Sequence, residues 1–480
     1  MKRMFKIALC FLLSMLMLIS FFSCSQSTEE TFDIEFSGQE ITGLGGLELV
    51  IGSFFDSTNG AVVGENVLGY SIGTGLADLA AARLKEVEIA LDCKIESVYM
   101  DNFYNTFSYS LAIGQSPCDI MFVPSMNYYG WMKAGYLSRI SSVSDYIDYT
   151  DSAKWGTPML LECLCYKDDL YGLLPAAWPD LVYTSFGYPL VANMNLISSV
   201  GGDDPRELYE QGMWTWDTFS EQIQKCTVIE GSETKYWGLG GHYPYFAEMI
   251  FRSNGVSLTR VNGDVSLTCG YYEPESYEAI EYIRLLRSGD LSYTYDPRNG
   301  VLEVVDAFCN SEVCYSFNPV QYIYGVFGEI SRTVDNYAVL RTPTGPDVDV
   351  GYAGGVYHAM NYTISFPSIV DNLDASAIVA NAVFEPFEEY KTFEDIKEYM
   401  NHNNFFDDRD AEAFFDICFN SSYNYFYTAG GGARGIPEAA SNTDKSPAEM
   451  IESLRNSMDE MFETSIGDTL SGYTAMFGDK

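Results

Sequence analysis

The sequence predicts an α/β fold of two lobes joined by a hinge. Between residues 47 and 123, strand-like runs alternate with amphipathic helical runs, an order typical of parallel sheets covered by helices. In the middle of the chain, two more strand-like runs, 170–174 and 188–195, flank a connector rich in proline, tryptophan and glycine. Such a connector suits a crossing from one lobe to the other. The 480 residues suffice for two or three units with separate cores.

The first lobe begins with a run of β-branched and apolar residues. We expect strands at 47–53, 93–99 and 119–123 and helices at 78–91 and 102–114. Ligands of sheets with this order bind beyond the carboxyl ends of the strands. The loops that follow residues 53, 123 and 174 are therefore the predicted site.

The second lobe is expected to begin near residue 187. Thr215 is a suitable N-cap for a helix that runs to residue 225, and Asp217 in its first turn favours the helix dipole. The region 351–365 is rich in glycine and is expected to return the chain to the first lobe. We further expect an aromatic turn at 236–246, strands at 312–317 and 337–341, and helices at 247–253, 276–288, 375–390, 410–419 and 447–462.

The N-terminus has the pattern of a secretory signal peptide, residues 1–23. Three basic residues precede an apolar stretch, 7–22, which is shorter than the roughly 20 residues of a membrane-spanning helix. A signal anchor that stays in the membrane is the alternative interpretation. The Phe-Phe-Ser-Cys sequence that ends at Cys24 resembles a bacterial lipobox and predicts lipidation of that cysteine. Residues 24–46 are polar and rich in glycine, which predicts a flexible tether.

The composition is strongly acidic, with 27 Lys and Arg residues against 67 Asp and Glu residues. This charge repels phosphate backbones, so it excludes nucleic-acid partners and disfavours a polyanionic ligand. Eleven cysteines are present, of which Cys10 lies in the signal peptide and Cys24 in the lipobox. The other nine are scattered and form no Cys-x-x-Cys pair, so neither a disulfide framework nor a zinc site is predicted. We expect most of them to be buried free thiols.

Three short motifs follow one another over about fifty residues. Residues 170–175 read Leu-Tyr-Gly-Leu-Leu-Pro, residues 191–196 read Val-Ala-Asn-Met-Asn-Leu, and residues 214–219 read Trp-Thr-Trp-Asp-Thr-Phe. None of them is specific alone, but the ordered set resembles the extracellular solute-binding proteins of ABC importers, in their family 1, carbohydrate-type branch. The weaker similarity extends from about residue 47 to about residue 437. A lysine that often follows the asparagine of the second motif in that family is absent here.

The resemblance implies a type II periplasmic-binding-protein fold and no catalytic activity. Residues 47–186 and 351–395 would form the first lobe, residues 187–350 the second, and residues 396–480 C-terminal helices on the hinge or second lobe. A ligand that touches both lobes would favour their closed arrangement. The chain would act as a lipid-anchored monomer on the extracellular face of the bacterial cytoplasmic membrane and deliver its solute to an ABC permease.

Aromatic and polar residues in the predicted cleft loops suit a neutral ligand rich in hydroxyl groups. A sugar ring offers an apolar face to an aromatic side chain and a rim of hydroxyls to carboxylates and amides. For each aromatic residue, packing in a core is an equally good interpretation. The predicted ligand-binding residues are Phe54, Asp56, Tyr128, Trp178, Asp180, Trp237, Tyr243, Asn318, Tyr352 and Gly354.

Two enzyme alternatives stay open. The Gly-x-Ser-x-Gly pattern around Ser71 fits a nucleophile elbow, with His242, His358 and His402 as the candidate bases. Too little chain precedes Ser71 for the sheet that such an elbow needs, and no oxyanion-hole glycine run is present. The 67 acidic residues could supply a glycosidase pair, but nothing singles one out. A binder of peptides or another polar solute is the non-enzymatic alternative.

No cofactor or metal site is predicted. The glycine-rich string 430–435 is followed by Ile-Pro rather than a helix, so it does not fit a dinucleotide site and indicates a loop. The acidic run 407–410 lacks the spacing and the glycine of a calcium loop, and we interpret it as a solvated helix start.

Overall fold

The computed structural model describes most of the chain after residue 42. The described residues are 43–53, 66–100, 102–241, 243–261, 267–287, 292–293, 300–325, 328–357, 360–425, 436, 439–440 and 444–478. Cys24, Phe54 and Asp56 of the predicted sites lie outside these ranges. None of the described helices is both long and apolar enough to cross a membrane.

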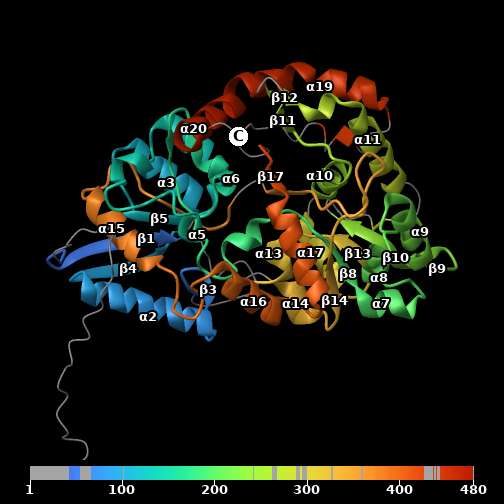
Figure 1. Ribbon diagram of the computed structural model, residues 1–480, viewed down its shortest axis with the longest axis horizontal. Helices are drawn as coiled ribbons and strands as arrows, with labels where there is room; N and C mark the ends of the chain where they lie inside the picture. The colour runs from blue at the N-terminus through green and yellow to red at the C-terminus, as the bar shows by residue number, and fades with distance from the viewer. Residues whose placement is uncertain are drawn as a thin grey trace, which may run out of the picture. The chain divides into compact units, whose positions relative to one another are not determined.

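A four-stranded sheet forms the core of the first lobe (Figure 1). Its strand order is β16-β5-β1-β4, in which β1 pairs in parallel with β4 and β5 while β16 is antiparallel to β5. The predicted strands 47–53 and 93–99 are confirmed. The elements are β1 (Leu47–Ser53), β4 (Cys93–Tyr99), β5 (Ile120–Val123), β16 (Thr363–Ser365), α2 (Gly75–Ala90), α3 (Phe103–Ala112), α4 (Tyr128–Ala134), α5 (Ser152–Trp155), α6 (Pro158–Leu161) and α15 (Leu373–Val383).

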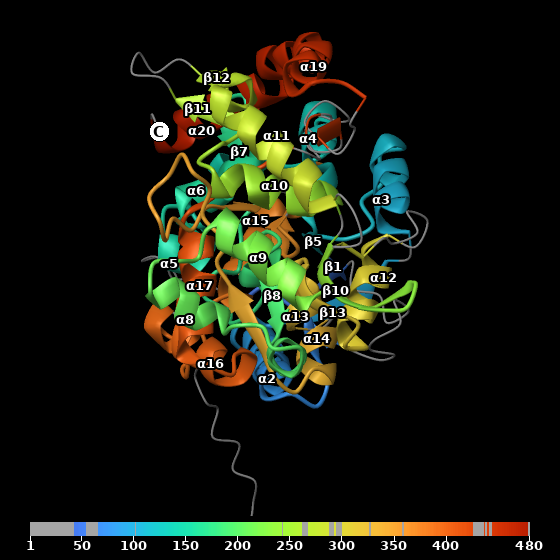
Figure 2. The same ribbon diagram turned by 90° about the vertical axis from the view of Figure 1, so that its right-hand side faces the viewer.

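A five-stranded sheet of order β14-β8-β13-β10-β9 forms the second core. Thr215 caps α9, as predicted, by accepting a hydrogen bond from the backbone of Thr218. Figure 2 shows α9 on the near side with α10 above it, and α9 packs against β10. The strands are β8 (Leu190–Asn193), β9 (Val228–Glu230), β10 (Glu233–Gly241), β13 (Val313–Phe317) and β14 (Tyr337–Leu340). The helices are α7 (Met194–Ser199), α8 (Pro205–Glu210), α9 (Trp216–Cys226), α10 (Tyr243–Ser253), α11 (Pro274–Arg287), α12 (Val301–Cys309), α13 (Val320–Ile323) and α14 (Glu329–Thr333).

The predicted aromatic turn at 236–246 is wrong, because most of it is the strand β10. Its glycines serve close packing instead of a turn. A Cβ atom on Gly238 would lie 2.2 Å from the carbonyl oxygen of Ile223 in α9. Glycine within a strand often marks such an approach of another backbone.

The two sheets are connected by segments that pass between them. The chain leaves the first sheet after β5, enters the second at β8, and returns between β14 and β16. Near these crossings, β15 (Gly355–Tyr357) pairs in parallel with β17 (Ser421–Tyr423), and Phe186 forms an antiparallel bridge with Tyr357. The predicted boundaries of the lobes are close to these crossings but stay predictions.

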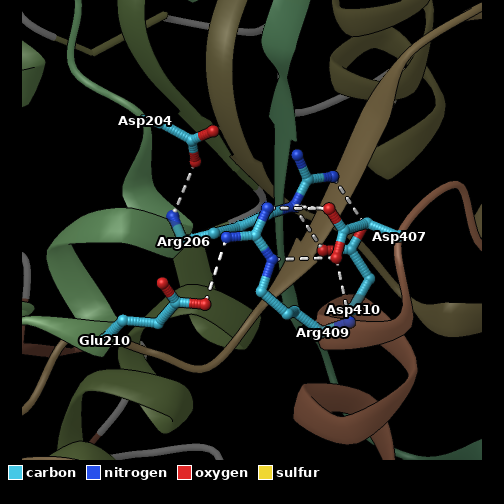
Figure 3. Close-up of polar contacts among 6 residues, drawn as sticks. All are labelled: Asp204, Arg206, Glu210, Asp407, Arg409 and Asp410. Atoms are coloured by element: carbon cyan, nitrogen blue, oxygen red, sulfur yellow. Dashed lines mark hydrogen bonds and ion pairs between the residues drawn. The ribbon is translucent and has the colours of Figure 1, made fainter.

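Helix α17 (Asp408–Phe419) is held on the second lobe by ion pairs (Figure 3). Arg206 in α8 donates from Nε and Nη2 to the two carboxylate oxygens of Asp410, both at 2.8 Å. Arg409 pairs with Asp407 at 2.8 Å and with Glu210 at 3.1 Å. This acidic run is a helix start, as interpreted, but it is only partly solvated, because Asp408 is exposed while the Asp410 side chain is 1% exposed.

The C-terminal helices contact a helix of the second lobe and a separate two-stranded hairpin. α19 (Pro447–Met461) packs against α11, while α20 (Gly467–Phe477) packs against β6 (Cys165–Tyr166) and β7 (Asp169–Leu170), within the range predicted for the first lobe. A π-helical turn, Phe462–Ile466, joins the two helices. α20 approaches β6 so closely that a Cβ atom on Gly472 would lie 2.5 Å from the backbone nitrogen of Tyr166.

The nine cysteines from Cys93 to Cys418 are all free thiols, and all but Cys309 are buried. This arrangement confirms the expectation from their spacing. Among the described residues, no three His, Cys, Asp or Glu side chains come together in a group that could hold a metal ion.

Candidate functional site

A polar cavity of about 150 Å³ lies at the junction of the predicted lobes: most of its lining comes from segments of the first lobe, and Gly325 comes from the second. It is bounded by the hairpin of β2 (Asn66–Val67) and β3 (Tyr70–Ser71), by the connector after Trp178, and by the loop after α13. Helix α16 (Phe393–Asn404) completes it. We call it the interlobe pocket. Its lining residues are Gly69, Tyr70, Ser71, Thr74, Leu76, Asp180, Leu181, Thr184, Gly325, Tyr362 and Tyr399.

A larger groove of about 610 Å³ lies along α11 and the start of α19. Its lining is mostly apolar, with Trp216 stacked on Tyr282 at 4.2 Å between ring centroids. Because its residues come from the second lobe and α19, it does not join the two lobes around a ligand. The interlobe pocket has the convergent polar groups that a specific site requires.

Asp180 provides the carboxylate of the interlobe pocket. Its backbone adopts a left-handed conformation, with φ of 65°, which is uncommon for a residue other than glycine. The Oδ1 atom accepts a hydrogen bond of 2.7 Å from Nδ2 of Asn404. Burial raises the pKa of Asp180 to about 6, and the hydrogen bond from Asn404 opposes that shift. Part of the side chain stays accessible in the pocket.

Tyrosines surround this carboxylate. Tyr70 stacks on Trp178 with 5.9 Å between ring centroids, and its hydroxyl donates to the Pro179 carbonyl at 2.7 Å. Burial, together with the negative charge of Asp180, raises the pKa of Tyr70, Tyr362 and Tyr324, so these phenols are neutral. The hydroxyl of Tyr324 has no hydrogen-bond partner among the described residues. The pocket therefore places neutral tyrosine side chains and the hydroxyl groups of serine and threonine residues beside one carboxylate.

Asn318 follows β13 at the carboxyl edge of the second sheet. It is fully buried, and neither the oxygen nor the nitrogen of its amide has a hydrogen-bond partner among the described residues. A buried amide without a partner costs about 1–3 kcal/mol, which a bound polar group would relieve. Asn318 does not line the interlobe pocket.

The other predicted site residues occupy varied places. Tyr128 and Trp178 are fully buried, and the Tyr128 hydroxyl bonds to Ser365 at 2.7 Å. Trp237 lies in β10 with its ring edge against Tyr293, at 6.0 Å between centroids.

Three further predicted residues lie in the second lobe or on the return segment. Tyr243 begins the sequence of α10. Gly354 is buried against Tyr352, and a Cβ atom on it would lie 2.8 Å from the Arg252 carbonyl oxygen.

Of the predicted set, only Asp180 is among the described residues that line the interlobe pocket. Sequence reasoning missed Tyr70, Tyr362 and Tyr399. Tyr70 lies inside the Gly-x-Ser-x-Gly pattern, in which only the serine is a predicted functional residue. That serine, Ser71, lines the pocket, and no histidine accompanies it there among the described residues.

A second buried carboxylate lies near the chain crossings. Glu248 in α10 is 3% exposed and accepts a hydrogen bond from the amide of Asn424, which follows β17. Its Oε1 atom has no partner among the described residues. Burial raises the pKa of Glu248 to about 7, while Asn424 and the positive charge of Arg252 oppose the shift.

We predict that Glu248→Gln makes the protein relatively more stable as the pH rises. The pKa is raised from 4.5 to about 7, so the stability of the neutral form is present below pH 4.5 and is lost as the pH rises through 7. The free energy of unfolding of the variant, relative to the original chain, should increase by up to about 3 kcal/mol over this range. Urea denaturation at pH 5 and 7.5 measures it, and parallel pH curves would contradict the assignment.

No protein-family profile and no curated protein matches the sequence. Solved structures do match. An ABC substrate-binding protein from Listeria monocytogenes in complex with cycloalternan superposes with a TM-score of 0.57 at 16% identity, over 88% of this chain and 99% of that one.

Two further structures agree with it. The GacH receptor of Streptomyces glaucescens, solved unliganded and with acarbose, gives a TM-score of 0.56 at 13% identity, over 88% of this chain and 100% of that one. The maltose/maltodextrin-binding domain MalE from Bdellovibrio bacteriovorus, bound to maltotriose, gives a TM-score of 0.57 at 13% identity, over 87% of this chain and 100% of that one. The predicted fold class is confirmed: the chain has the two-lobed α/β fold of the ABC substrate-binding proteins.

Proposed function

We propose that this chain is the extracellular solute-binding component of an ABC importer, and that it captures a sugar or oligosaccharide between its lobes. The observation that carries the proposal is the interlobe pocket, in which Asp180 and Tyr70, Tyr362 and Tyr399 converge from distant parts of the chain. The carboxylate can accept hydrogen bonds from sugar hydroxyls, and the rings can cover the apolar face of the sugar. The similar structures bind cycloalternan, acarbose and maltotriose, which supports this ligand class.

In this mechanism the solute is bound and delivered without any covalent reaction. A ligand that contacts both lobes favours the arrangement in which both sets of contacts are made. The loaded protein would then present the solute to a permease.

We also propose that Cys24 carries a lipid that holds the monomeric protein at the extracellular face of the membrane. Cys24→Ser should release the protein from the membrane fraction, and unchanged retention there would contradict lipidation.

Thermal unfolding with a panel of sugars tests the ligand class. A sugar that binds only the folded state stabilises it by about 2.7 kcal/mol at a hundredfold excess over its Kd. Maltotriose, cycloalternan, cellobiose and tagatose make a suitable first panel, with a sugar alcohol as the control for general solvent effects. Mass spectrometry should recover the bound sugar intact. Cleavage of the sugar would favour a hydrolase, and stabilisation by peptides alone would contradict the proposal.

A further inference from the structure

The carboxylate of Asp180 is largely buried and has no compensating positive charge among the residues that the structure describes. Its only side-chain hydrogen bond within the described part of the chain comes from Asn404, and no Lys, Arg or His of that part forms an ion pair with it. The chain treats another buried acid differently, since Asp410 is matched by both donors of Arg206. Burial of an unpaired carboxylate is costly. A positively charged group bound in the interlobe pocket would therefore be stabilised by pairing with Asp180.

The surroundings of Asp180 favour a cation further. Tyr70, Tyr362 and Tyr399 line the same pocket, and aromatic faces attract ammonium groups. Thr184 and Ser71 add hydroxyl oxygens that can accept hydrogen bonds from an amine. A cavity of about 150 Å³ admits a small polar group, not a large side chain of a partner protein.

The net negative charge of the whole chain also favours a positively charged ligand. With 67 acidic and 27 basic residues, the protein attracts cations and repels anions over its surface. Sugars that carry carboxylates or phosphates are therefore disfavoured at the approach to the pocket. Neutral sugars experience neither effect.

We propose that the interlobe pocket selects a positively charged amino group, so that the solute is an amino sugar or an oligosaccharide that contains one. This inference rests on the proposed function, and it departs from the uncharged ligand that the sequence suggested. Asp180 is the residue that determines the specificity. Its Oδ2 atom would pair with the ammonium group while Oδ1 keeps its hydrogen bond to Asn404.

Three disaccharides that differ only in the substituent at C2 of each ring provide the test. Chitobiose, N,N′-diacetylchitobiose and cellobiose share a β-1,4 linkage and carry an ammonium, an acetamide or a hydroxyl group at C2. Isothermal titration at pH 6.5 and 0.15 M salt should show chitobiose binding at least tenfold more tightly than cellobiose, because hydrogen bonds between two charged groups are the stronger ones.

The variant Asp180→Asn isolates the charge. Asparagine tolerates the left-handed backbone of this position and can still accept the hydrogen bond from Asn404. The preference for chitobiose should fall to less than threefold. Asp217→Asn is the matched control, because it changes the net charge equally at an exposed position of α9 and should keep the preference. The unfolding midpoints of both variants show whether they are folded.

The outcomes separate this inference from the proposed function. Equal binding of chitobiose and cellobiose, or a preference that survives in Asp180→Asn, overturns the inference and leaves a sugar-binding protein. The same holds if a neutral sugar of the first panel binds and chitobiose does not. If no sugar of either panel binds, the proposed function fails, and the inference fails with it.

Discussion

Asp410→Ala should lower the free energy of unfolding by about 3–5 kcal/mol, because it removes both hydrogen bonds from the buried charge of Arg206 and leaves only Asp407, at 3.9 Å. The Arg206 side chain is 9% exposed and the Asp410 side chain 1% exposed, and the pair is joined by two hydrogen bonds of 2.8 Å. The loss should loosen α17 from α8. Urea denaturation at neutral pH, followed by tryptophan fluorescence, measures it.

An exposed ion pair provides the control for Asp410→Ala. Arg139 and Asp168 are separated by a similar 2.9 Å, but their side chains are 52% and 61% exposed. Asp168→Ala should therefore cost about 1 kcal/mol or less. The double variant Arg206→Met with Asp410→Leu should regain much of the loss, since apolar side chains can replace a buried pair. Equal costs for the two aspartates would contradict the role of burial.

Trp178→Ala should cost about 3–5 kcal/mol of stability, the usual range for removal of a large aromatic side chain from a core. Trp178 is fully buried, with its ring centroid 4.5 Å from that of Phe387 and 5.0 Å from that of Phe384. Its Nε1 donates a hydrogen bond of 3.1 Å to the Glu385 carbonyl. Because Tyr70 stacks on the same ring, the variant should also weaken sugar binding.

The two roles of Trp178 can be separated by one further substitution. Trp178→Phe keeps an aromatic ring beside Tyr70. It should lose less than half as much stability as Trp178→Ala. If Trp178→Ala instead kept the stability and abolished sugar binding, Trp178 would be a ligand contact, as the sequence suggested, and its role in the core would be wrong.

Local patterns in the sequence were sufficient to predict most of the sheet cores. The strands 47–53 and 93–99 and the cap at Thr215 depend on neighbours in sequence, and the structure has them as predicted. The prediction for the region of β10 was wrong because Gly238 allows the backbone of α9 to approach the strand and does not form a turn. That contact joins residues whose distance in space cannot be read from local composition.

The interlobe pocket shows the same limit. Asp180 could be found because it lies within the predicted proline-rich connector between the lobes. Tyr70, Tyr362 and Tyr399 are separated along the chain by up to 329 positions and meet only in the folded protein. With 36 tyrosines in the sequence, no pattern distinguishes these three from the tyrosines of the core. Likewise, Asp410 and Arg206 are 204 residues apart, so their pairing was not foreseeable.

The segment formed by α19, the π-helical turn and α20 is fastened at one end to α11 and at the other to β6 and β7. Rotation of one lobe against the other must therefore bend this segment or detach an end of it. A rotation that kept both contacts would change the shape of the segment, and the π-helical turn Phe462–Ile466 between them is where its backbone already departs from α-helical geometry.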